Sequence, residues 1–274
     1  MSSHGGDRVF SGSIPQLYER YMVPLIFEPY AIDLAGRVAS LQPSAVLETA
    51  AGTGVVTRHL ADRLPAEVAI VATDLNQAMI DHAASIGTSR SVTWRQADAM
   101  RLPFENNTFD AVVCQFGAMF LPDKVAGFAE ARRVLRSGGT FLFNVWDRIE
   151  DNEFADCVTQ AMAGLFPNDP PRFLARLPHG HHDRTAIASA LSDAGFTGPN
   201  ALDTVTAQSC AASARVVAMA FCQGTPLRNE IEARDATILD KATDIATAAI
   251  EERFGSGRVS GKIQAHVFAA ARSA

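Results

Sequence analysis

Short apolar runs alternate with helical patterns of ten to fifteen residues between about Gln42 and Asp147. The run at 68–73 is continuously apolar, which is typical of a strand buried on both faces of a parallel sheet. This alternation predicts an α/β core in which helices cover a mostly parallel sheet. The strands of the core are expected at 44–49, 68–73, 92–95, 109–115 and 140–146.

Helices are predicted between these strands. The first follows a glycine-bearing turn and carries apolar residues such as Val55 and Leu60 on one face. A second is expected to begin after Asn76, whose side chain suits a helix cap, and to reach about Ser85. A long helix over 123–135 is expected to stop at the Ser137-Gly138-Gly139 turn, because glycine suits a left-handed helix end.

The pattern changes after Asp147. Residues 151–180 are expected to be irregular, because Asp169-Pro170-Pro171 breaks any helix there. Asp183 is predicted to cap the helix that follows, and Gly195-Phe196 to close it. The later segments are a helix over 184–194, a short strand over 201–206, helical patterns over 211–253 and a strand-like segment over 262–271.

Composition and charge narrow the classes of function. Of the 274 residues 47% are hydrophobic and 20% charged, which indicates a packed globular protein. A formal charge of −6 argues against a protein that coats duplex nucleic acid, because such binding depends on clustered Lys and Arg. The four cysteines lie far apart without metal-ligand spacing, so we expect reduced thiols and a cytoplasmic location. The first apolar run, 22–27, contains Pro24 and is too short for a membrane span or a signal peptide.

The most informative motif is Val46-Leu47-Glu48-Thr49-Ala50-Ala51-Gly52-Thr53-Gly54, a strand end followed by a turn and a helix start. Unpaired N–H groups at such a helix start accept an anion or a carboxylate. Asp74 closes the second strand 20 positions after Gly54. An acid at that point suits the two hydroxyls of a ribose, so the motif predicts a cofactor that contains adenosine.

Two kinds of adenosine cofactor compete at this point. A nicotinamide dinucleotide site requires Gly or Ala at the sixth place of the glycine fingerprint, where this chain has Thr57. Glu48, just before the turn, suits a cationic amine better than a diphosphate. Asp98-Ala99 follows the third strand, where an acid beside a small residue suits the amino group of an adenine. The residues therefore favour an adenosine cofactor that has no diphosphate over a nicotinamide dinucleotide.

These motifs, taken in order, resemble the class I S-adenosylmethionine-dependent methyltransferases, and most closely their small-molecule branch of ubiquinone and menaquinone (type 11) methyltransferases. The resemblance covers about 42–147. It rests on Glu48–Gly54, Asp74, Asp98-Ala99, Leu102-Pro103-Phe104 with Phe109-Asp110, and Arg133-Val134-Leu135-Arg136-Ser137-Gly138-Gly139. It implies a Rossmann-like seven-stranded sheet in the order 3-2-1-4-5-7-6, whose last strand is antiparallel, with places for 201–206 and 262–271.

The resemblance also implies roles for individual residues. Glu48 holds the methionine ammonium, and the backbone around Ala50, Gly52 and Gly54 lines the methionine part. Asp74 binds the ribose hydroxyls. The remaining expected contacts are Leu75 and Met79 against the adenine, Asp98 and the Ala99 amide on its edge, and Gln115 at the methionine moiety. The family often has glycine in place of Ala50, where we expect one methyl group to be tolerated.

The first 41 residues are predicted to form a helical lid. Tyr18, Tyr21 and Tyr30 are the only tyrosines of the chain, and the first two, three positions apart, share a helical face. An amphipathic helix packed on the core explains them equally well. As in the family, a lid with phenols over the site excludes water from methyl transfer. The methyltransferase domain is then 42–274, with its cofactor core at 42–147 and a helical cap or insertion at about 150–180 and 211–253.

The cluster His179-Gly180-His181-His182-Asp183 lacks the i, i+4 spacing of zinc helices, so we predict no metal site. One histidine of the cluster, represented by His181, is a candidate substrate contact or base. No general base is identified otherwise.

Together these features predict an enzyme that moves the methyl group of S-adenosylmethionine to a small, largely apolar acceptor and leaves S-adenosylhomocysteine. Two alternatives stay open: a binding protein that has lost catalysis, and an NAD(P)-dependent oxidoreductase. Neither nucleic acid nor a membrane span is expected, and the oligomeric state is left open, a homodimer included.

Overall fold

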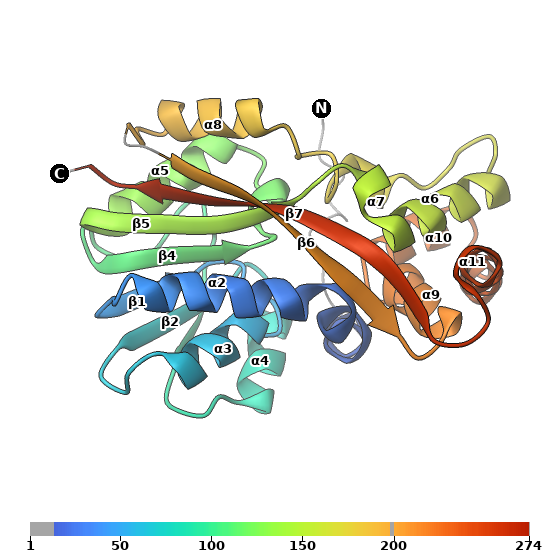
Figure 1. Cartoon of the computed structure of the whole chain (residues 1–274), viewed down its shortest axis with the longest axis horizontal. Helices are drawn as coiled ribbons and strands as arrows, with labels where there is room; N and C mark the ends of the chain where they lie inside the picture. The colour runs from blue at the N-terminus through green and yellow to red at the C-terminus, as the bar shows by residue number, and fades with distance from the viewer. Residues whose placement is uncertain (1–13, 198–199, 274) are drawn as a thin grey trace. The chain divides into compact units, whose positions relative to one another are not determined.

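The computed structural model describes residues 14–197 and 200–273. The chain divides into two compact units, which we describe separately (Figure 1). Of the described residues, unit 1 contains those up to Glu28 together with Trp146–His181 and Thr206–Gln264. Unit 2 contains Pro29–Val145, His182–Val205 and the residues from Ala265 onward. No helix in the described ranges is long and apolar enough to cross a membrane.

The strands form one seven-stranded sheet in the order β3-β2-β1-β4-β5-β7-β6, as predicted. Strands β1 to β5 are parallel, and β7 is antiparallel. Val46 at the centre pairs with Ile70 of β2 and Ala111 of β4. The strands are β1 (Ala45–Glu48), β2 (Ala69–Asp74), β3 (Thr93–Gln96), β4 (Phe109–Gln115), β5 (Leu135–Trp146), β6 (Asn200–Ala211) and β7 (Val259–Ala271).

Unit 2 contains the parallel strands and the helices that cover them. Figure 1 shows α5 and α8 on one side of these strands and α2 and α3 on the other. Phe128 of α5 packs against Phe141 and Phe143 of β5, whose rings stack with centroids 4.7 Å apart. The helices are α2 (Glu28–Ser40), α3 (Val55–Arg63), α4 (Gln77–Ile86), α5 (Lys124–Val134) and α8 (Arg184–Asp193), with the 3-10 turn η3 (Ala118–Phe120).

Unit 1 is mainly helical. Its helices pack through small and apolar residues such as Ala218, Ala246 and Val158, which are fully buried. Its elements are α1 (Ile14–Leu17), the π-helix η2 (Tyr18–Phe27), the 3-10 turn η4 (Ile149–Asp151), α6 (Glu153–Leu165), α7 (Phe173–Arg176), α9 (Ala214–Gln223), α10 (Leu227–Arg234) and α11 (Leu239–Phe254).

Residues 151–180 are not irregular, so this prediction was wrong. They contain the 13-residue helix α6, which buries Phe154, Val158 and Met162 along one face. The prolines that motivated the prediction stand at 170–171, after α6 has ended, so they limit only the loop before α7.

One further local prediction needs correction. Helix α5 ends at Val134, and the chain enters β5 at once. Gly138 does not end a helix but lies within β5 with φ +80°, near a shift in the pairing of β4 with β5. Pro24 lies inside η2, and α2 follows η2 directly.

Asp183 caps α8 as predicted, since its carboxylate accepts hydrogen bonds from the N–H groups of Thr185 and Ala186. Gly195, with φ +89°, stands just after that helix. The two late strands are longer than predicted. β6 and β7 have 12 and 13 residues, and each contributes to both units.

Candidate functional site

Three polar side chains stand at the carboxyl ends of neighbouring strands in unit 2. Glu48, Asp74 and Gln115 are the last residues of β1, β2 and β4. The chain runs from β1 to β2 on one side of β1, whereas β4 lies on the other side, so the strand order reverses here. Ligands of open α/β sheets bind in the crevice at such a reversal. The predicted site residues are thus the ends of the strands that frame it.

The turn after β1 has left-handed backbone at Ala50, Gly52 and Gly54, with φ of 54°, 56° and 84°. A side chain at Gly54 would be strained, because the backbone is left-handed there and a Cβ would lie 2.8 Å from Cη2 of Trp94. Ala50 tolerates the conformation at a strain cost of about 1–2 kcal/mol for a residue that has a Cβ. Helix α3 begins directly after Gly54, so its first N–H groups stand at this turn.

Asp74 holds this turn from the end of β2. Its carboxylate accepts hydrogen bonds from the Gly52 N–H at 2.9 Å and the Asn76 N–H at 2.8 Å, and the side chain is 8% exposed. Burial raises the pKa of Asp74, and these hydrogen bonds oppose the rise. Asn76 precedes α4 as predicted, but its side-chain amide bonds Asp74 at 3.3 Å and does not cap the helix.

Glu48 is almost completely buried, with 1% of its surface exposed. The Thr57 hydroxyl, on α3, donates a 2.5 Å hydrogen bond to one carboxylate oxygen. Burial raises the pKa of Glu48 to about 8, although Thr57 and the Arg58 charge act against the rise. A cation placed beside this carboxyl group would favour its ionised form.

The turn after β4 faces the turn after β1. Phe116 also has left-handed backbone, with φ 49°, and its N–H donates to the buried Asn144 side chain at 2.8 Å. Gly117 approaches Ala50 so closely that a Cβ at position 117 would lie 2.4 Å from the Ala50 Cβ. Strained residues of this kind gather at binding sites, where the surrounding structure holds them.

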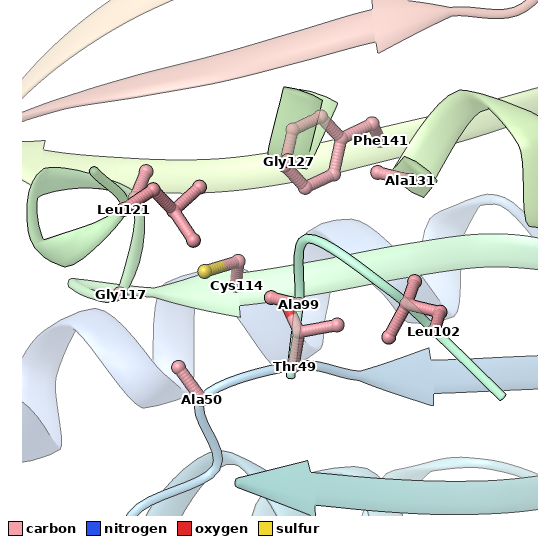
Figure 2. A pocket seen from close by; sticks show the side chains of 11 residues that line it. Thr49, Ala50, Ala99, Leu102, Cys114, Gly117, Leu121, Gly127, Ala131 and Phe141 are labelled. Atoms are coloured by element: carbon pink, nitrogen blue, oxygen red, sulfur yellow. The ribbon is translucent and has the colours of Figure 1, made fainter. Parts of the chain in front are cut away.

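A small apolar pocket lies beside these turns (Figure 2). Ala99 and Leu102 line it from the loop after β3, Cys114 from β4, and Gly117 from the turn beyond. Burial raises the pKa of the Cys114 thiol to about 11, so the thiol keeps its proton at neutral pH and is no nucleophile. Of the residues predicted to contact adenine, Ala99 alone lines this pocket.

The remaining predicted adenine contacts differ in exposure. Asp98 is exposed and accepts a hydrogen bond from the Met100 N–H at 2.9 Å, within the loop that carries Ala99. Leu75 is 42% exposed, whereas Met79 is 2% exposed in α4. Contacts of these side chains with adenine stay predictions.

The three tyrosines fall in different places. Tyr18 and Tyr21 are half-buried in η2 of unit 1, where Tyr18 stacks on Phe27 at 5.0 Å. Tyr30 is fully buried in unit 2, and its hydroxyl donates to the Val205 carbonyl at 3.3 Å. Its ring meets Phe116 edge to face at 5.2 Å. Tyr30 therefore packs against the turn after β4.

The histidines of the cluster differ in burial. His179 is 5% exposed in unit 1 and lines a second pocket, whereas His181 is half-buried. Within the described ranges, no three His, Cys, Asp or Glu side chains come together as metal ligands. The sequence offers no signal that separates two histidines two positions apart in a loop.

The structure adds residues that the sequence reasoning did not assign. Thr57 had served only to argue against a dinucleotide, and here it binds Glu48. Thr53, in the turn after β1, has a buried hydroxyl for which the described part of the chain provides no hydrogen-bond partner. The Thr53 hydroxyl can bond a ligand, so the turn fits a molecule with polar groups.

Comparisons with known proteins agree with this geometry. A family model described as a methyltransferase domain matches residues 46–139, from β1 into β5. The ubiquinone/menaquinone biosynthesis C-methyltransferase UbiE of Idiomarina loihiensis is 30% identical over 184 residues, which are 62% of this chain and 72% of that protein. Identity and coverage of this extent establish that the two proteins belong to one family.

Solved structures show the same fold. The YcgJ protein of Bacillus subtilis has a TM-score of 0.56 at 17% identity and covers 90% of this chain and 99% of its own. An N-methyltransferase of Haemonchus contortus, solved with S-adenosylhomocysteine, has a TM-score of 0.58 at 16% identity, over 98% of this chain and 60% of its own.

Proposed function

The chain belongs to the class I S-adenosylmethionine-dependent methyltransferases, and on that premise we propose that it methylates a small, largely apolar acceptor through the site at the ends of β1, β2 and β4. The observation that carries the proposal is the set of acids at the strand reversal. Glu48 and Asp74 end the two strands that flank the left-handed turn.

Each acid has a task in this proposal. When bound, the cofactor supplies a methyl group activated by a sulfonium charge. The Glu48 carboxylate pairs with the methionine ammonium, and Thr57 keeps it oriented. The Asp74 carboxylate, already fixed by the Gly52 and Asn76 N–H groups, accepts the ribose hydroxyls. No bulky side chain projects from the backbone of the turn, so the methionine part can lie against it.

The neighbouring segments are assigned to the adenine of the cofactor and to the end of the cofactor that carries the sulfur. Asp98 and the Ala99 amide bind the adenine edge, and Leu75 and Met79 complete its apolar surroundings. Gln115, 9% exposed at the end of β4, contacts the methionine moiety. These assignments are supported by the places of the residues after β2, β3 and β4.

We propose further that the first 41 residues form a helical lid. Its support is that the described residues up to Glu28 belong to unit 1 with the helical segments at 150–180 and 211–253. Residues 1–13 lie outside the described part of the chain. Tyr30 is less suited to a moving lid, because it is fully buried in unit 2.

The support for the acceptor class comes from a relative. The pocket of unit 1 that Trp146 and Phe221 line has room for about one water molecule, so it does not define the acceptor. The Idiomarina relative is named for C-methylation in ubiquinone and menaquinone biosynthesis, so a reduced quinone is the first acceptor to test.

The test is methyl transfer from radiolabelled S-adenosylmethionine to a panel of acceptors. The panel contains reduced quinones, alkylphenols and apolar amines, with glycine and ethanolamine as polar controls. We expect label in the apolar products and none in the polar ones. Transfer to the polar controls alone, or none at all by protein that binds S-adenosylhomocysteine, would refute the proposed acceptor class or the activity.

A further inference from the structure

We propose that the Thr53 hydroxyl and the first N–H groups of α3 bind the carboxylate of the methionine part of S-adenosylmethionine, and so select ligands whose amino acid is intact. This inference rests on the proposed function. In that function Glu48, Asp74 and Asp98 bind the ammonium, the ribose and the adenine, whereas the carboxylate is given no partner. The residues that could bind it all belong to unit 2.

The first turn of α3 lies beside the acid that is proposed to hold the ammonium. Thr57, the third residue of α3, donates a 2.5 Å hydrogen bond to the Glu48 carboxyl group. In an α-amino acid the ammonium and the carboxylate are attached to the same carbon atom. The Glu48 charge repels a carboxylate, so the carboxylate must lie close to Glu48 but point toward other groups. The start of α3 is within one hydrogen bond of Glu48 and fits this requirement.

The start of α3 offers hydrogen-bond donors to an anion. The helix is nine residues long, and the Arg58 N–H donates to the Gly54 carbonyl at 2.9 Å as its first hydrogen bond. The N–H groups of Val55, Val56 and Thr57 therefore have no partner within the helix. Gly54 stands at the N-cap position and has no side-chain oxygen to cap them. Such a helix start favours an anion, because its N–H groups and the helix dipole both attract negative charge.

Thr53 is independent evidence for a ligand at this place. The residue is 1% exposed, and its buried hydroxyl has no hydrogen-bond partner among the residues that the structure describes. Buried hydroxyl groups of proteins are nearly always hydrogen-bonded. Thr53 stands two positions before Val55, so its hydroxyl belongs to the same end of α3. A carboxylate bound there would accept a hydrogen bond from this hydroxyl and from the helix start together.

The backbone around Thr53 is fixed by two neighbouring side chains. The Arg58 guanidinium donates to the Thr53 carbonyl at 2.7 Å, and the Asp74 carboxylate accepts from the Gly52 N–H at 2.9 Å. These hydrogen bonds hold the turn before and after the Thr53 side chain. The guanidinium also brings a positive charge to the turn, which favours an anionic group on the ligand over a neutral one. The donors for the carboxylate are thus oriented by the fold itself.

This arrangement has a consequence for ligand selectivity. A site built to hydrogen-bond a group of the ligand rejects an analogue that lacks the group, because the donors of the site are then left unpaired. The matched analogue is decarboxylated S-adenosylhomocysteine, which lacks the carboxylate and keeps the amine, the ribose and the adenine. The contributions of Glu48 and Asp74 therefore cancel in the ratio of the two affinities. A carboxylate that lies in solvent predicts a ratio near one.

The experiment is titration calorimetry of the full chain with S-adenosylhomocysteine and with its decarboxylated analogue. Thr53→Val removes the hydroxyl and keeps the shape of the side chain, whereas Thr53→Ser keeps the hydroxyl. Thr108→Val is the matched control, because Thr108 precedes β4 at the amino end of the strand and its hydroxyl donates to the Glu105 carbonyl at 2.7 Å. Thr53→Ala replaces Thr53→Val should the latter fail to fold.

Wild type should bind S-adenosylhomocysteine roughly a hundredfold more tightly than the decarboxylated ligand, with about tenfold of this ratio due to the Thr53 hydroxyl and the rest to the helix start. Thr53→Val should lower the ratio about tenfold through weaker binding of S-adenosylhomocysteine alone, whereas Thr53→Ser and Thr108→Val should keep it. A wild-type ratio near one, or an unchanged ratio in Thr53→Val, overturns the inference and leaves the proposed function standing, since both ligands still bind. Binding of neither ligand by wild type refutes the proposed function and this inference together.

Discussion

Thr57 donates a 2.5 Å hydrogen bond to the buried carboxyl group of Glu48, from the first turn of α3 to the end of β1. The residue that fails the dinucleotide fingerprint is thus the one that orients the acid at the strand end. A small hydrophobic residue at position 57 would leave the Glu48 carboxylate buried without this hydrogen-bond donor. The ionised form of Glu48 would then be less stable.

Thr57→Val should therefore weaken S-adenosylhomocysteine binding. A hydrogen bond to a charged group is worth about 1.5–3 kcal/mol, so we expect a loss of at least tenfold in affinity at pH 7. Titration calorimetry measures it. The matched control is Thr247→Val on α11, where the hydroxyl bonds only a backbone carbonyl within the helix. Equal affinity of Thr57→Val and wild type would show that Glu48 does not hold the ligand's ammonium.

Cofactor binding should also depend on pH. The pKa of Glu48 is about 8 in the free protein, whereas the bound ammonium requires the carboxylate. Binding must then release a proton below pH 8, so S-adenosylhomocysteine affinity should rise by close to tenfold from pH 6 to 7 and by about fivefold from pH 7 to 8. Calorimetry in buffers of different ionisation enthalpy counts the proton. Glu48→Gln should bind weakly and independently of pH, and a flat profile in wild type would contradict the assignment.

Glu48 should also make the stability of the folded protein depend on pH, and this stability should fall as pH rises, whereas cofactor affinity rises. The folded pKa of Glu48 lies above its ordinary value of 4.5, so between about pH 4.5 and 8 the unfolded chain has lost the proton that the folded chain keeps. The free energy of unfolding contributed by this group falls as pH rises through that window. Urea unfolding at pH 5 and 7.5 should show a smaller loss in Glu48→Gln than in wild type, and an equal loss would count against the raised pKa.

Ala50 offers a test of the strained turn. Because its φ is 54°, Ala50→Gly should raise the free energy of unfolding by about 1 kcal/mol, whereas glycine normally costs stability. Ala129→Gly, inside α5, is the control and should lower it by about 1 kcal/mol. Denaturant unfolding measures both. If both variants lose the same stability, the turn is not left-handed at position 50 in solution.

Gly117→Ala tests the close approach of the two turns. The new Cβ would lie 2.4 Å from the Ala50 Cβ and 2.7 Å from the Cys114 sulfur, so we expect a loss of about 1–3 kcal/mol and weaker cofactor binding. Combination with Ala50→Gly removes the first of these contacts and should restore part of the loss. A Gly117→Ala protein with wild-type stability and affinity would mean that the turns lie further apart.

The sequence predicted the cofactor end of the molecule because that end depends on local patterns. Apolar runs ended at Glu48, Asp74 and Gln115, and parallel strands necessarily bring such ends to one edge of a sheet. The glycine turn was also predictable from the sequence, since Gly52 and Gly54 do have left-handed backbone.

The helical unit was less predictable because its order depends on contacts between distant segments. Helix α6, with Phe154 and Val158 on its buried face, was not predicted, because the prolines that follow the helix indicated an irregular segment. His179 contacts the Asp147 carbonyl, 32 positions away along the chain, and no local pattern encodes this contact. Likewise Asn144 and Phe116 form a hydrogen bond only once β4 and β5 pair.

The central claim is that the acid at the end of β2 binds the ribose of S-adenosylmethionine, and titration calorimetry with S-adenosylhomocysteine tests it most directly. Wild type should bind this ligand and not NADH. Asp74→Ala should lose about 1.5–3 kcal/mol of binding free energy, at least tenfold in affinity, while remaining folded. Asn76→Ala, which removes the 3.3 Å amide contact to Asp74 and keeps the hydrogen bond from the backbone N–H, should bind nearly as wild type. A folded Asp74→Ala protein with undiminished affinity, or a wild type that prefers NADH, would contradict the account.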